Sequence, residues 1–67
     1  MLKLTVNGRT VALEEACDLA RALNRWGHSG SGFAVAVNGS FVPRSSYESF
    51  LLRGGESIEV LVPMQGG

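Results

Sequence analysis

Apolar and polar residues alternate near both ends of the chain. Residues 2–6 place an apolar side chain at every second position, and residues 57–62 do the same. A period of two is typical of a β-strand with one buried face. We therefore predict one strand over residues 2–6 and another over residues 57–62, with Glu59 and Leu61 facing away from the core. The side chains predicted to face inward are Leu2, Leu4, Val6, Ile58, Val60 and Val62.

Two Asn-Gly pairs separate further apolar segments. Asn7-Gly8 lies between the first strand and residues 9–13, and Asn38-Gly39 lies between residues 33–37 and 40–42. Both central residues of a type I′ turn need positive φ, which Asn and Gly tolerate best. The sequence therefore predicts two β-hairpins, the second of which ends at a proline that cannot donate to a sheet.

Between the hairpins, the apolar spacing lengthens to three and four residues. This period predicts an amphipathic helix over residues 15–26, with Asp18 inside it on the polar side. Arg25 suits the last turn and Gly27 suits the position after the helix, whereas no N-cap residue is evident at its start. The apolar stripe consists of Ala16, Leu19, Ala20, Leu23 and Trp26.

The remaining segments have no clear period. Residues 28–32 are rich in glycine and serine and predict a flexible connector. Residues 44–50 predict an irregular stretch with one helical turn, and we expect Tyr47 and Leu51 to fill the core. Gly54-Gly55 predicts the turn before the last strand.

This order of elements predicts an α+β domain with the β-grasp (ubiquitin-like) fold over residues 1–63. The first and last strands would pair in parallel, because the helix supplies the long crossover that parallel pairing needs. We expect a mixed sheet of four to five strands covered on one face by one helix. Residues 64–67 would form an extended, flexible C-terminal tail.

Composition narrows the classes of function. The chain has 67 residues, 45% of them hydrophobic and 18% charged, with a formal net charge of zero. This balance gives no electrostatic footprint for nucleic acid or an anionic membrane. No apolar run reaches the ~20 residues of a membrane span, and no signal segment precedes the first strand. With a single cysteine, the chain has no internal disulfide, and we expect a cytoplasmic protein that is monomeric when free.

Side chains offer little catalytic or metal-binding chemistry. Cys17 and His28 are the single residues of their kinds, so they cannot form a zinc site without outside ligands. The sequence has no paired carboxylates at useful spacing, no nucleophile elbow and no phosphate-binding glycine loop. A core this small can hardly enclose a pocket. We expect a protein that is not an enzyme and binds no cofactor or metal itself.

The chemistry instead lies in the last five residues. Pro63 has no N–H and should end strand pairing. Met64, Gln65, Gly66 and Gly67 would then reach about 13–14 Å, narrowing to two residues without side chains. The terminal carboxylate is ionised at neutral pH. A slim rod of this kind can enter another protein's active-site channel, so we predict Gly67 as the reacting residue. An incidental Gly-Gly end is the alternative, because termini are often rich in small residues.

Three blocks of sequence also resemble a known family. Residues 34–44 contain Val-Asn-Gly and then Val-Pro-Arg, residues 52–59 follow, and residues 63–67 end in Gly-Gly. Together they resemble ThiS, the ubiquitin-like sulfur carrier of thiamine biosynthesis, over essentially the whole chain. One departure is Gly55-Glu56, where family members more often carry Gly-Asp, and it affects no functional residue.

The resemblance implies reactions at Gly67. A ThiF-type adenylyltransferase would use ATP and Mg²⁺ to convert the carboxylate into an acyl-adenylate, because a carboxylate is a poor electrophile until one oxygen leaves with AMP. A cysteine desulfurase persulfide would replace AMP and leave a thiocarboxylate. A thiazole synthase of the ThiG type would accept that sulfur. ATP and Mg²⁺ would belong to the activating enzyme.

Partner docking and two rival functions stay open. By analogy with ubiquitin-like carriers, Phe41, Arg44 and Leu61 could form a docking surface beside the tail, although Phe41 could equally be core and Arg44 a solvated charge. A MoaD-like small subunit of molybdopterin synthase would have the same fold and tail but would pass sulfur to a pterin precursor. A plain β-grasp interaction module would use no tail chemistry.

Overall fold

The fold is described for residues 1–28 and 32–62 in a computed structural model. The elements, in chain order, are β1 (Leu2–Val6), β2 (Arg9–Leu13), β3 (Cys17–Asp18), α1 (Leu19–Arg25), β4 (Ala34–Val37), β5 (Ser40–Val42), the 3-10 helix η1 (Arg44–Ser49), β6 (Leu51–Leu52) and β7 (Ser57–Leu61).

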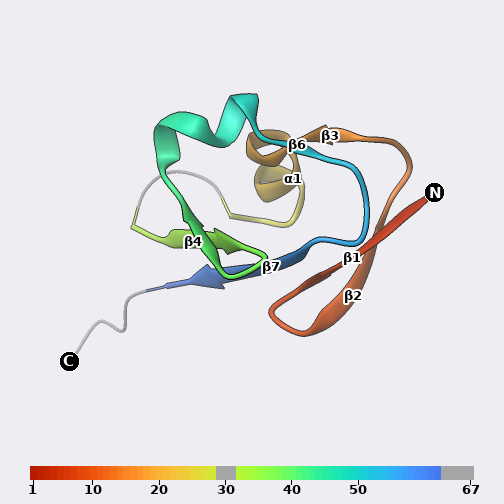
Figure 1. The fold of residues 1–67 in the computed structure, drawn as a ribbon, viewed down its shortest axis with the longest axis horizontal. Coiled ribbons are helices and arrows are strands. Elements are labelled where there is room, and N and C mark those ends of the chain that lie inside the picture. The colour runs from red at the N-terminus through yellow and green to blue at the C-terminus, as the bar shows by residue number, and fades with distance from the viewer. Residues whose placement is uncertain (29–31, 63–67) are drawn as a thin grey trace.

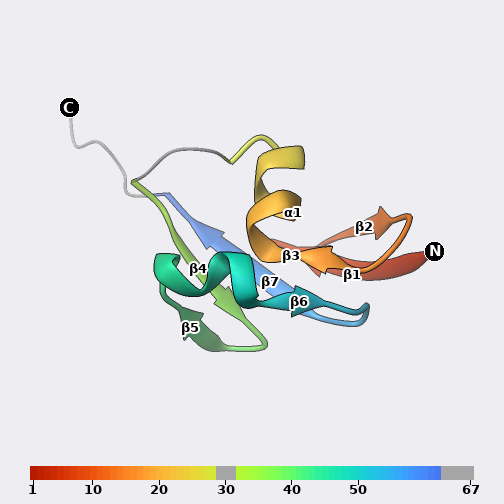
Figure 2. The same cartoon turned by 90° about the horizontal axis from the view of Figure 1, so that it is seen from above.

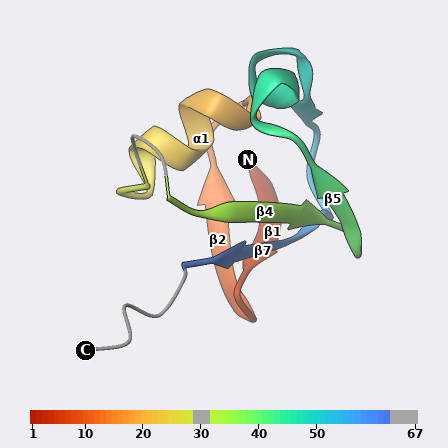
Figure 3. The same ribbon diagram turned by 90° about the vertical axis from the view of Figure 1, so that its left-hand side faces the viewer.

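Five strands form one mixed sheet in the order β2-β1-β7-β4-β5. The first and last strands of the chain, β1 and β7, pair in parallel, and the neighbouring pairs are antiparallel. Both α1 and η1 lie on the same side of this sheet (Figures 1 and 3). The structure therefore confirms the predicted β-grasp fold. Its second sheet, made of β3 and β6, was not predicted.

The core lies between the five-stranded sheet and α1. Alternate residues of each strand point toward the helix, so the apolar side chains predicted from the period of two come together there. Leu19 and Ile58 are fully buried, one from the helix and one from the central strand. The other buried side chains are Leu4, Val6, Leu13, Ala22, Leu23, Val35, Val37, Val42, Tyr47, Leu52 and Val60.

The helix begins later than the sequence predicts. It starts at Leu19 because Asp18 is its N-cap: the Asp18 carboxylate accepts a hydrogen bond of 3.0 Å from the Arg21 N–H. Cys17 and Asp18 pair with β6 instead of joining the helix, and this pairing with a distant segment overrides the local period. Ala16 is therefore exposed. The predicted end is right to within one residue: α1 ends at Arg25, Trp26 is its C-cap, and Gly27 follows with φ +89°.

Two core predictions near the end of the chain are wrong. Leu51 is 46% exposed, and its neighbour Leu52 is the fully buried residue of β6. Val62 is 64% exposed, because β7 ends at Leu61, whose partner Ala34 is the first residue of β4. Without a partner strand beside it, Val62 does not continue the alternation. Tyr47 is buried, as predicted.

The adjacent leucines of β6 give a matched test of this core. Leu52→Ala is expected to lower the free energy of unfolding by about 2–5 kcal/mol, because it leaves a cavity among packed side chains. Leu51→Ala is expected to change it by no more than about 0.5 kcal/mol, as for other surface substitutions. Urea unfolding followed by circular dichroism measures both. Equal losses in the two variants would contradict the assignment of Leu52 to the core.

Candidate functional site

The candidate site begins at the end of β7, the central strand of the sheet. On one side β7 pairs with β4 as far as Leu61, so the strand is held by backbone hydrogen bonds up to the residue before Val62. The tail residues singled out from the sequence, Met64, Gln65, Gly66 and Gly67, lie outside the described residues. The predicted boundary between domain and tail lies there as well.

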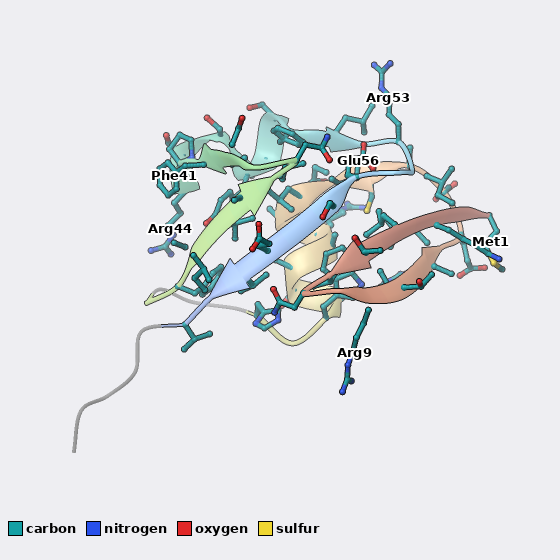
Figure 4. All side chains as sticks on the ribbon, turned by 60° about the horizontal axis from the view of Figure 1, so that its bottom comes forward. Met1, Arg9, Phe41, Arg44, Arg53 and Glu56 are labelled. Atoms are coloured by element: carbon teal, nitrogen blue, oxygen red, sulfur yellow. The ribbon has the colours of Figure 1, made fainter. Side chains whose placement is uncertain are left out.

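A carboxylate stabilises the turn from which β7 starts. The side chain of Glu56 accepts hydrogen bonds from the N–H groups of Arg53 at 2.9 Å and Gly54 at 2.8 Å. Gly54 has φ +109°, a conformation that favours glycine. Figure 4 shows Glu56 at this turn. Glu56 therefore has a structural role in this turn. It is the residue at which the sequence differs from the family that it resembles.

Two asparagine side chains bind the backbone of β7 from opposite sides. Asn38 Oδ1 accepts from the Ser57 N–H at 2.9 Å. Asn7 Oδ1 accepts from the Val60 N–H at 2.8 Å, and Asn7 Nδ2 donates to the Val60 carbonyl at 3.4 Å. Sequence reasoning explained both asparagines by their turns alone. The signal it missed is that Val-Asn-Gly occurs twice, once in each hairpin beside β7.

Large apolar side chains are exposed on β5 and at the end of β7. Phe41 is 68% exposed and Leu61 is 60% exposed, on the face of the sheet opposite the helices. In the strand register Phe41 is paired with Ala36, and Leu61 is paired with Ala34. These four residues form what we call the apolar face. The exposure of Phe41 rules out its alternative placement in the core, and its docking role stays a prediction.

Arg44 does not share the apolar face. It is the first residue of η1, and with Ala20, Asn24 and His28 it lines a hollow between η1 and α1, on the helix side of the sheet. Figure 4 shows Phe41 and Arg44 both near the β5 edge. The structure therefore places Phe41 and Leu61 on the same face of the sheet, on either side of β4, and Arg44 around the edge of the sheet.

Glu59 is a further candidate that sequence reasoning did not select. It is the only charged residue of β4, β5 and β7, and it is exposed opposite Ala36, next to Phe41 in the register. Within residues 1–28 and 32–62, the one ion pair joins Arg21 to Asp18 at 3.8 Å. The Glu59 carboxylate is therefore available to a cationic group of a partner.

Neither a metal site nor a membrane-crossing helix is found in the described part of the chain. No group of three or more His, Cys, Asp or Glu residues could hold a metal ion there. No helix among the same residues is long and apolar enough to cross a membrane. Cys17 is a free, half-buried thiol.

Comparison with known proteins decides the family. Residues 3–67 match the model of the ThiS family, and this match covers both terminal glycines. The chain belongs to the ThiS family. Members of this family are small sulfur carriers of thiamine biosynthesis rather than catalysts, and they interact with enzymes of that pathway.

Solved structures agree with the ThiS assignment. A crystal structure of thiamine biosynthesis protein ThiS from Geobacter metallireducens is similar with a TM-score of 0.84 and 25% sequence identity, covering 98% of this chain and 100% of that one. An NMR solution structure of a thiamine biosynthesis protein from the same organism gives a TM-score of 0.80 and 28% identity, covering 98% and 88%. No curated protein sequence matches the chain.

Proposed function

We propose that this ThiS-family chain carries sulfur as a thiocarboxylate on Gly67 and delivers it to a thiazole synthase of the ThiG type. The observation that supports this most directly is the family match through Gly66 and Gly67, on a fold whose central strand leads toward these residues. In this proposal the working group is a main-chain carboxylate, and the domain is a protein co-substrate.

The chemistry requires partner enzymes. In a ThiF-type adenylyltransferase, which would bind ATP and Mg²⁺, a Gly67 carboxylate oxygen attacks the α-phosphate of ATP and pyrophosphate leaves. The terminal sulfur of a persulfide, formed by a cysteine desulfurase, then attacks the acyl carbon, and AMP leaves. A second thiol reduces the resulting acyl disulfide and releases the thiocarboxylate. Gly66 gives the backbone access to the channel, because a Cβ there would meet its walls.

The apolar face is the proposed docking surface for the activating enzyme. Leu61 lies one residue before the last described residue, and the five residues that follow Val62 span at most about 18 Å when fully extended. An enzyme that takes the end of the tail must therefore lie close to this face. Exposed apolar groups next to a solvated carboxylate suit a partner with an apolar pocket and a nearby Arg or Lys that would pair with Glu59.

Reconstitution of sulfur transfer tests the proposal. The purified chain is incubated with a ThiF-type enzyme, ATP, Mg²⁺, cysteine and a cysteine desulfurase, and is then divided between a thiazole synthase and the large subunit of molybdopterin synthase. We expect sulfur to enter thiazole. Transfer to the pterin precursor alone would favour the MoaD-like function. If the same enzymes load another carrier but do not convert this chain, the result would favour the interaction module.

A further inference from the structure

The two strands that flank β7 support different parts of it. β1 ends at Val6, which pairs with Ile58, so β7 continues for three residues beyond the parallel ladder. The last backbone bond on this side runs from the Asn7 N–H to the Ile58 carbonyl, at 2.8 Å. The chain then turns away through Asn7-Gly8, because both residues have positive φ. No residue of β1 is left to pair with Val60 in the parallel register.

Successive residues of a strand point their N–H and C=O groups to opposite sides. Since Ile58 faces β1, Val60 faces the same side, where the backbone of β1 has ended. Val60 is only 5% exposed, so unpaired polar groups there would be costly. The Asn7 amide meets both of them, accepting from the N–H at 2.8 Å and donating to the carbonyl at 3.4 Å. The amide takes the place of one further residue of β1.

We propose that Asn7 is a positioning residue for the tail. By holding Val60 two residues before the end of the described chain, its amide fixes the direction in which β7 leaves the sheet toward Gly67. The first hairpin thus extends the support of β7 on the side that β4 does not cover (Figure 2 shows β7 between β1 and β4). This inference rests on the proposed function, since it concerns presentation of the tail to an activating enzyme.

Asn38 provides a matched control within the same molecule. It occupies the same position of an Asn-Gly turn, with φ 52° against 51° for Asn7. Its side chain also accepts from β7, but at Ser57, the first residue of the strand. Loss of the Asn38 side chain therefore weakens β7 at the end far from the tail. Glycine can replace either residue without strain in the turn, because it adopts positive φ freely.

The test compares Asn7→Gly, Asn7→Asp and Asn38→Gly in steady-state adenylation by a ThiF-type enzyme, measured as ATP–pyrophosphate exchange. Asn7→Gly removes the 2.8 Å bond from the Val60 N–H and the longer 3.4 Å bond to its carbonyl. We expect it to lower kcat by about two- to tenfold, a factor of the size that one well-formed hydrogen bond contributes. KM should change little, because the apolar face is intact. Asn7→Asp retains the acceptor for the Val60 N–H and should recover most of kcat. Asn38→Gly should match the wild type in kcat.

Thermal unfolding of the same variants separates positioning from stability. Asn7→Gly should lose at least as much stability as Asn38→Gly, because it loses two side-chain bonds to β7 where Asn38→Gly loses one, and both variants should be folded at the assay temperature. Equal kcat values for Asn7→Gly and Asn38→Gly, whether both unchanged or both reduced, would overturn the inference. Failure of the proposed function gives a different result, namely no exchange activity with the wild-type chain while the enzyme still activates another carrier.

Discussion

Replacing Gly66 with valine is expected to lower the rate of adenylation by at least about a hundredfold, the cost of moving a reacting group by roughly an ångström. The valine side chain would meet the walls of a channel that fits only main-chain atoms. Stability should stay within about 0.5 kcal/mol of the wild type, because the buried side chains of the described residues lie between Leu4 and Val60 and glycine itself has no side chain to pack. ATP–pyrophosphate exchange measures the rate, and urea unfolding measures the stability.

A change of length gives the same test without a change of side chain. One alanine added after Gly67 removes the carboxylate from its position and should also stop exchange. The control is one alanine added before Met1, which is 84% exposed and lies at the opposite end of the sheet from the end of β7 (Figures 1 and 2). Exchange that survives at the wild-type rate in either tail variant would refute the narrow-channel explanation.

Serine in place of Phe41 or Leu61 is expected to raise KM of the activating enzyme by about five- to thirtyfold in each case, since central apolar residues of an interface contribute about 1–2 kcal/mol or more. Both side chains are more than half exposed, so their removal should leave the fold intact. kcat at saturation should change little, because the tail itself is untouched. Initial rates over a range of carrier concentrations give both constants.

Leu51→Ser is the matched control for these two variants. Leu51 is also an exposed leucine, 46% exposed, but it lies on β6, outside the five-stranded sheet. If the three variants shift KM equally, or if none does, the apolar face is not the docking surface. Glu59→Lys adds a separate check on charge: it should raise KM most at low salt, because screening weakens repulsion between like charges.

Much of the fold could be predicted because its signals are local. The alternation in residues 2–6 and both Asn-Gly pairs depend on neighbours in the sequence, and β1 and the two hairpin turns were placed correctly. The start of α1 could not be predicted in the same way, since Cys17 and Asp18 pair with Leu52 and Leu51, far along the chain. The same distant pairing determines which leucine of β6 is buried.

The candidate site, too, could be predicted only where its signals are local in the sequence. The tail was recognised from composition and position, and the family match covers it. Exposure of Leu61 followed from alternation in its strand, whereas Arg44 begins an irregular segment whose course the sequence does not indicate. The role of Asn7 depends on where β1 stops beside β7, which is a matter of register. No local pattern gives that register.

Gly67 is the proposed sulfur-carrying residue. The most direct test of this role is the mass of the C-terminal peptide from the natural protein, purified from cells with an active thiamine pathway. The proposed function predicts a fraction of the peptide in which one oxygen of Gly67 is replaced by sulfur and which is lost when the activating enzyme is deleted. A peptide that is never thiolated in such cells, or that continues past Gly67 without processing, would contradict it.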